Sequence, residues 1–190
     1  MLFRIKSFLN FLIRSTNQHR VHSPFVYTLV TLCFYDRKKR ASYVSIQSAY
    51  KNNTSDISYK HAKLINRIVP YFNIENALII ETKSNFIHRI ISFENSVKTY
   101  NAPESMGEFD LIYTDINNCK SDFKFVELLF SKIHNETIFI INSIHKSKEN
   151  FDLWTQLVAH QKTTVTIEMY NLGFVFFRKE QVKEEFTLRV

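Results

Sequence analysis

Glycine is almost absent from this sequence. There are two glycines in 190 residues, where ordinary usage of about 7% would give roughly 13. They are Gly107 and Gly173. Proteins that bind nucleotide-like cofactors normally place glycine where the first strand turns into its helix, because only a residue without a Cβ lets the backbone touch a phosphate or a ribose. The shortage of glycine therefore argues against an intact cofactor loop of that kind.

Cysteine and long apolar runs are scarce as well. The two cysteines, Cys33 and Cys119, have no metal or redox spacing, so we expect both to be small buried side chains in a reducing compartment. No apolar run reaches the roughly 20 residues that span a bilayer. The apolar stretch at residues 2–14 contains basic residues and no clear cleavage site for a secretory signal. These features predict a cytoplasmic protein without a transmembrane segment.

Positive charge is concentrated in residues 1–70. This part has a net charge of +10, whereas residues 71–190 have a net charge of −3. Such asymmetry can signal contact with nucleic acid or an anionic membrane surface. It is equally compatible with a basic arm packed on an acidic body, or with solvated loops. The basic run at residues 36–40 shows no alternation with aromatic residues of the kind that binds single strands. Residues 1–70 are therefore a candidate for weak contact with nucleic acid or an anionic surface, and no other partner is indicated.

The hydrophobic pattern predicts helices through residues 1–70. The expected helices cover residues 2–14, 25–35 and 58–70. In the first of them, Phe8, Leu9, Leu12 and Ile13 form one stripe. Ser23 followed by Pro24 is a helix-start signal, in which the Ser23 hydroxyl caps the helix and Pro24 takes its first position. The polar stretch at residues 36–57 is expected to be a mobile connection.

From residue 76 onward, short apolar strands alternate with amphipathic helices. The expected strands are residues 77–80, 97–100, 109–116, 137–144, 163–169 and 173–178, and the helices are 86–93, 121–134 and 148–160. This alternation implies a parallel sheet, but the turn between the last two strands is short enough to make them antiparallel. We therefore predict one α/β domain at residues 1–190, with a basic helical N-terminal arm at 1–70. Its core at 71–190 would be a mostly parallel sheet that ends in an antiparallel hairpin.

This ending resembles the Rossmann-like fold of class I S-adenosylmethionine-dependent methyltransferases, whose seventh strand lies antiparallel beside the sixth. Three stretches are similar to a bacterial family of such enzymes, namely RVHSPFVY at 20–27, IHKSKE at 144–149 and the tail at 165–189. With the strand that ends in Asp115, the similarity covers most of the chain outside residues 36–57 and 81–108. The resemblance implies S-adenosylmethionine as the cofactor.

The departures from this family fall on the cofactor loop. The family's first strand and loop read roughly N-I-L-E-L-G-T-S-x-G, whereas residues 76–85 read NALIIETKSN. Thr82 matches, but Glu81 and Asn85 stand at the two glycine positions, and a side chain at 81 would project toward the methionine part of the cofactor. The 34 residues from Glu81 to Asp115 are also few for two βα units. Cofactor binding is therefore in doubt.

Later motifs are partly kept. The family pattern D-G-N-H appears as DINN at 115–118, and in F-D-D-I-H-W the histidine is kept while Asn142 and Ser143 replace both acids. The cofactor-binding residues that the resemblance implies are Thr82, Asp115, Asn117 and His145. Alternatively, Asp115 caps the following helix and His145 is an ordinary hydrogen-bonded group. One acid beside two neutral groups makes a poor Mg²⁺ site, so we expect no metal and assign no catalytic residue.

Three hypotheses about function remain open. The first is a degenerate methyltransferase-like protein, a pseudoenzyme that serves as a scaffold or binds a partner. The second is an active methyltransferase that acts on an unknown substrate and holds the cofactor weakly through Asp115. The third is a basic adaptor that binds nucleic acid or an anionic membrane surface through residues 1–70. Glu81 and the shortened middle of the chain favour the first.

Overall fold

The structure is a computed structural model, and it describes residues 2–51, 57–81, 85–93, 96–119 and 123–190. Helices α1 to α7 are Leu2–Arg14, Pro24–Leu29, Ser42–Lys51, Tyr59–Tyr71, Phe86–Ser92, Phe123–Phe130 and Lys148–Ala159. Strands β1 to β7 are Asn76–Ile80, Lys98–Tyr100, Phe109–Asp115, Ile133–Asn142, Val165–Met169, Leu172–Phe176 and Glu184–Thr187. The short helical segments η1 to η4 are Gln18–Arg20, Val30–Phe34, Pro103–Ser105 and Ile116–Cys119.

The strands form one seven-stranded sheet in the order β2-β1-β3-β4-β6-β5-β7. Strand β6 is antiparallel to both of its neighbours, β4 and β5, and every other pair of adjacent strands is parallel. The predicted mostly parallel sheet with an antiparallel β5–β6 hairpin is therefore confirmed. Strand β7, which pairs in parallel with β5 at the edge, was not anticipated from the sequence.

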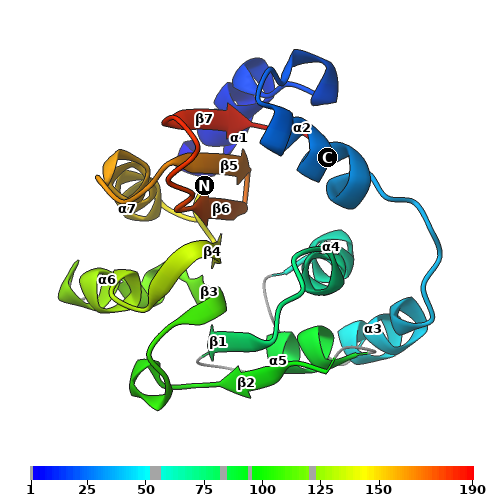
Figure 1. The fold of residues 1–190 in the computed structure, drawn as a ribbon. Helices are drawn as coiled ribbons and strands as arrows, with labels where there is room; N and C mark the ends of the chain where they lie inside the picture. The colour runs from blue at the N-terminus through cyan, green and yellow to red at the C-terminus, as the bar shows by residue number, and fades with distance from the viewer. Residues whose placement is uncertain (1, 52–56, 82–84, 94–95, 120–122) are drawn as a thin grey trace.

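Helices cover both faces of this sheet, so the fold has three layers (Figure 1). Helices α2 to α5 pack on one face, where they meet alternate residues such as Ala77 and Ile79 of β1. Helices α6 and α7 pack on the other face, which receives the intervening residues such as Leu78. Because both faces are covered, the central strands are apolar on both sides, as the sequence predicted.

The part of the sheet outside β1 is short. Doubly wound nucleotide-binding halves place two strands beyond the first one, in the order 3-2-1. Among the described residues, only the three-residue strand β2 lies there, paired with β1 through Asn76 and Leu78 (Figure 1). The expected shortening between Glu81 and Asp115 thus corresponds to a single short strand outside β1 in the described part of the chain.

One expectation about the N-terminal helices was wrong. Residues 36–57 are not simply a connection, because they contain helix α3. Ile46 and Ala49 of α3 are buried beside α4, and the Ser42 hydroxyl donates a 2.9 Å hydrogen bond to Asn66 Oδ1 of α4. Ile46 and Ala49 are the only apolar side chains of α3 that are buried. So narrow an apolar stripe gives a weak periodic signal, and this helix depends on its tertiary partner.

The cysteines are buried, as predicted. Cys33 lies in the π-helical turn η2 that continues α2, and Cys119 ends η4. Burial raises the pKa of each thiol to about 12. Both side chains therefore stay protonated at neutral pH and act as small apolar groups.

The expected cap at Ser23 was also wrong. Pro24 does occupy the first position of α2, but the Ser23 side chain makes no capping hydrogen bond. Its hydroxyl is buried and has no hydrogen-bond partner in the described part of the chain. The contrast is Ser58, whose side chain accepts a 3.2 Å hydrogen bond from the His61 N–H at the start of α4.

These two serines predict opposite results on truncation. Ser58→Ala should lower the free energy of unfolding by about 1 kcal/mol, the usual loss for a removed cap. Ser23→Ala should change it by less than about 0.5 kcal/mol, because no capping bond is lost. Urea unfolding of both variants measures the difference. Equal losses would mean that the Ser23 hydroxyl does cap α2 in solution.

Candidate functional site

The candidate site lies at the carboxyl edge of the sheet. Strands β1, β3, β4 and β5 are mutually parallel, so all four end at this edge. Ligands of open α/β sheets bind outside the carboxyl ends of the strands. Of the residues that the sequence singled out, Asp115, Asn117 and His145 lie here, and Thr82 falls outside the described residues.

At the end of β1, Glu81 caps the helix that follows. Its Oε2 accepts a 3.0 Å hydrogen bond from the Ile87 N–H in the first turn of α5, whereas Asn85 at the N-cap position makes no side-chain cap bond. A carboxylate is stabilised at this place, because the first N–H groups of a helix lack partners within it. Glu81, which stands where the methyltransferase family has glycine, therefore places its own carboxylate at the start of α5.

At the end of β3, Asp115 joins two strands. Its Oδ1 accepts hydrogen bonds from the backbone N–H and the side-chain Nδ2 of Asn117, at 2.9 and 2.5 Å. Its Oδ2 accepts from Ser143 Oγ at 2.5 Å and from Asn142 Nδ2 at 3.5 Å. Asp115 and Asn117 are thus brought together, and the carboxylate also binds the two residues that replace the family's acids.

The backbone at Ser143 supports this junction. Ser143 has a φ of 68°, in the left-handed region that costs a non-glycine residue roughly 1 kcal/mol. Its carbonyl accepts a 2.8 Å hydrogen bond from Asn150 Nδ2 of α7, and its hydroxyl is held by Asp115. These two bonds offset the strain and hold the end of β4 in place.

The sequence analysis missed the role of Asn118. Its Nδ2 donates to the Ile80 carbonyl at 3.3 Å and to Thr114 Oγ1 at 3.2 Å, and so ties the ends of β1 and β3 together. The signal was present as the last residue of the DINN segment, where the family has histidine. Between β1 and β4, side chains of this protein therefore link the strand ends directly.

The end of β2 also differs from a cofactor site. Dinucleotide-binding folds use an acidic residue about 20 residues after the glycine loop to bind the ribose hydroxyls. Here β2 ends at Tyr100, and Asn101 follows it. The Tyr100 hydroxyl donates a 3.4 Å hydrogen bond to Asn76 Oδ1, and neither residue carries a carboxylate.

His145 belongs to a different network. It is buried after β4, and its Nε2 lies 2.9 Å from Oε1 of Glu168, a buried residue of β5. Its Nδ1 forms a short hydrogen bond with the Ser7 hydroxyl of α1. The ring stacks on Tyr170, with centroids 4.8 Å apart and planes 14° from parallel. Glu168 and Ser7 could not be found from the sequence, because 138 residues separate Ser7 from His145.

The Ser7–His145–Glu168 chain has the residue types of a nucleophilic triad but not its setting. Ser7 lies within α1, where backbone N–H groups bond to carbonyls of the same helix. A hydrolytic site instead needs free N–H donors beside the nucleophile to stabilise an oxyanion. Other contacts fix α1 at the same place, including a 3.1 Å hydrogen bond from the Tyr170 hydroxyl to the Arg4 carbonyl. The chain of bonds therefore anchors α1 across the carboxyl ends of β4 and β5.

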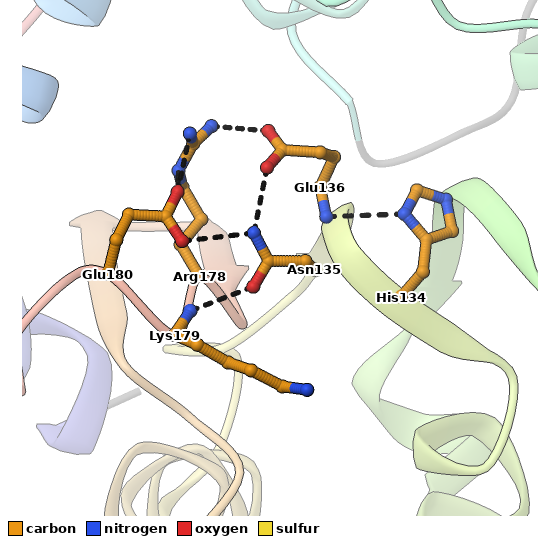
Figure 2. Close-up of polar contacts among 6 residues, drawn as sticks. All are labelled: His134, Asn135, Glu136, Arg178, Lys179 and Glu180. Carbon is orange, nitrogen blue, oxygen red and sulfur yellow. Dashed lines mark hydrogen bonds and ion pairs between the residues drawn. The ribbon is translucent and has the colours of Figure 1, made fainter.

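A second polar cluster lies at the opposite, amino-terminal edge of the sheet (Figure 2). Arg178, just after β6, forms ion pairs with Glu136 at 2.5 Å and Glu180 at 2.6 Å. Asn135 Nδ2 donates to Glu180 Oε2 at 3.0 Å. Both acids are about half exposed, so the pairs contribute little to stability. This cluster joins the start of β4 to the segment after β6, away from the edge where α/β ligands bind.

Metal-binding groups are not gathered in the described part of the chain. Within it, no set of three or more His, Cys, Asp or Glu side chains is placed to hold a metal ion. At the candidate site, the oxygen and nitrogen neighbours of Asp115 are the neutral groups of Asn117, Asn142 and Ser143. Such a donor set is weak for Mg²⁺, which prefers carboxylates and phosphates.

Several solved structures share this arrangement of strands and helices. The SAH-bound Podospora anserina methyltransferase PaMTH1 is 8% identical, with a TM-score of 0.54 over 84% of this chain and 98% of its own. Cofactor-bound Rv0187 from MTB is 10% identical, with a TM-score of 0.54 over 80% and 96%. A Staphylococcus aureus protein described as a caffeoyl-CoA O-methyltransferase is 15% identical, with a TM-score of 0.53 over 80% and 97%. The chain has the class I methyltransferase fold.

Sequence comparison adds nothing to this assignment. No protein-family model matches the chain, and no curated protein matches it. At identities of 15% or less, the methyltransferase neighbours share the fold with this protein and nothing finer. Function has to be argued from the site.

Proposed function

We propose that this protein is a methyltransferase-like pseudoenzyme, which keeps the fold as a scaffold or partner-binding module and has lost the cofactor. The observation that carries the proposal is the position of Glu81. Its carboxylate caps the start of α5 at 3.0 Å, in the turn where related folds bring bare backbone against their cofactor. A ligand could bind the Ile87 N–H only by displacing that carboxylate.

The other strand ends support the same conclusion. Both oxygens of the Asp115 carboxylate accept hydrogen bonds from the protein, and β2 ends without an acid. His145 is occupied by Ser7 and Glu168. The residues present therefore do not fit S-adenosylmethionine.

Calorimetric titration with S-adenosylmethionine and S-adenosylhomocysteine tests the proposal. We expect no binding heat up to millimolar concentration, which corresponds to a binding free energy weaker than about −4 kcal/mol. Thermal unfolding with either compound should show no shift in Tm, because a ligand stabilises the folded state only if it binds that state.

A micromolar isotherm would overturn the proposal, and its loss in Asp115→Asn would support the alternative, a methyltransferase that holds the cofactor through Asp115. The matched variant is Glu81→Gly combined with Asn85→Gly, which restores glycine at both loop positions. Binding by this variant alone would support Glu81 as the block. Binding by neither protein would support the broader loss of the site, at β2 as well as in the loop.

A further inference from the structure

Helix α1 presents an apolar stripe to the surface. The stripe consists of Leu2, Ile5, Leu9 and Ile13, which are 52–83% exposed. Their spacing of three to four residues places them on one side of the helix. The opposite side carries Ser7 and Phe11, which are buried. Leu9 and Ile13 belong to the stripe expected from the sequence, but the structure turns them outward rather than into the core.

The fold does not need this stripe, because α1 is already held by its other face. Ser7 bonds to His145, and the Phe8 and Phe11 rings contact Tyr170 at centroid distances of 5.1 and 5.4 Å. The chain after α1 is fixed as well, by a β-bridge between Thr16 and Leu188. The anchored face and the exposed face are therefore separate, and the helix is held in a fixed orientation.

The charge around the stripe is entirely positive in this part of the sequence. Residues 1–35 contain no Asp or Glu, and α1 itself carries Arg4, Lys6 and Arg14. A groove of about 440 Å³ runs beside α1, and Lys6, Arg14 and Lys148 of α7 are among the residues that line it. Arg14 lies 4.0 Å from Glu168, which also bonds to His145, and Lys148 pairs with Asp152 at 2.9 Å. Arg4 and Lys6 are therefore the cations of α1 without an ion pair among the described residues, on the same helix as the exposed row of Leu and Ile side chains.

We propose that α1 docks on the surface of a membrane containing anionic phospholipid. The stripe would enter the boundary between headgroups and acyl chains, and Arg4 and Lys6 would lie against lipid phosphates. Apolar residues on one side with flanking cations are the features of helices that lie in the membrane interface. None of the helices in the described ranges is long and apolar enough to cross a membrane, and α1 has 13 residues.

Two other occupants fit the surface less well. Nucleic acid would bind the cations, but its charged phosphate backbone makes no favourable contact with the exposed apolar side chains of Leu2 and Ile13. A second copy of the chain would cover the stripe, but it would also bring the cations of two α1 helices together, and like charges facing each other oppose association. An anionic bilayer satisfies the apolar and the charged parts at once.

Vesicle flotation tests the proposal directly. The full chain is mixed with vesicles of phosphatidylcholine alone, or of three parts phosphatidylcholine to one part phosphatidylglycerol. We expect binding to the anionic vesicles only. The double variant Leu2→Gln with Ile13→Gln should lower the partition coefficient at least about tenfold, because it removes apolar insertion while keeping the charge. Lys6→Gln should lower it about fivefold, as expected for one surface cation.

The matched control is Val44→Gln with Val182→Gln, two valines that are each 73% exposed, one in α3 and one just before β7. This control should bind vesicles within about twofold of the parent protein, and all variants should keep the parent Tm. Equal loss in control and stripe variants, or no binding to anionic vesicles, would overturn the proposal. Two further results would overturn it, in each case if the parent protein does not bind vesicles. One is a dimer of the parent protein that the stripe variant does not form, and the other is binding to mixed RNA that the stripe variant loses. None of these outcomes depends on whether S-adenosylmethionine binds.

Discussion

Gly173→Ala is expected to lower the free energy of unfolding by about 3 kcal/mol, the upper end of the usual range for an overfilled core. A Cβ at this position would lie 2.5 Å from Cζ3 and 2.7 Å from Cη2 of Trp154. Neither partner can easily move aside. Gly173 pairs with Ile141 of β4 on one side and Glu168 of β5 on the other, and Trp154 is buried in the layer formed by α6 and α7.

The other glycine is the matched control for this prediction. A Cβ on Gly107 would meet nothing within 4 Å, so Gly107→Ala should change stability by less than about 0.5 kcal/mol. Denaturant unfolding measures both variants. Adding Trp154→Leu to Gly173→Ala should cost less than the sum of the two single losses, because the clash is removed. Equal stability of the two alanine variants would show that β6 and α7 can move apart.

Arg67→Met is expected to cost about 2–4 kcal/mol, because it leaves buried carbonyl groups without donors. The Arg67 guanidinium donates to the carbonyls of Cys33 and Phe34 at 2.9 and 3.0 Å and to the Tyr43 hydroxyl at 3.1 Å. These carbonyls lie at the end of the π-helical turn η2. Arg67 therefore ties three helical segments, η2, α3 and α4, with one side chain.

The matched control is Lys60→Met, which removes one positive charge from the exposed side of α4, the helix that also carries Arg67. Its amine bonds to the Val190 carbonyl at the surface, so we expect a loss below about 1 kcal/mol. The loss of stability in Arg67→Lys should lie between those of Arg67→Met and Lys60→Met, because an ammonium keeps the charge but not the planar set of donors. An unfolding midpoint for Arg67→Met equal to that of Lys60→Met would show that water replaces the guanidinium.

The elements that were predicted well are those whose signal is local. The long apolar run that ends in Asp115 could only be a buried strand, and the short turn between β5 and β6 required an antiparallel pair. Helix α3 and strand β7 were missed because each depends on a distant partner rather than on its own pattern. Local propensity carries no information about such partners.

The same division applies to the candidate site. The meeting of Asp115 and Asn117 could be predicted, because an aspartate commonly bonds to the backbone two residues later. For Glu81, the sequence predicted a side chain at a glycine position of the cofactor loop. It did not predict that this side chain would cap α5. The partners of His145 and Arg67 come from other elements, so neither network could be read before the fold was known.

The bridge between Thr16 and Leu188 sets an order of assembly. Thr16 accepts a hydrogen bond from Arg189 and donates one to Thr187, at 3.0 and 2.9 Å, so this attachment of the chain after α1 forms only once the segment around residue 188 is in place. During synthesis, residue 16 is made before residue 188, and contacts so far apart in sequence form only after a long loop has closed. Until that loop closes, the chain after α1 is without this strand-like attachment to the sheet.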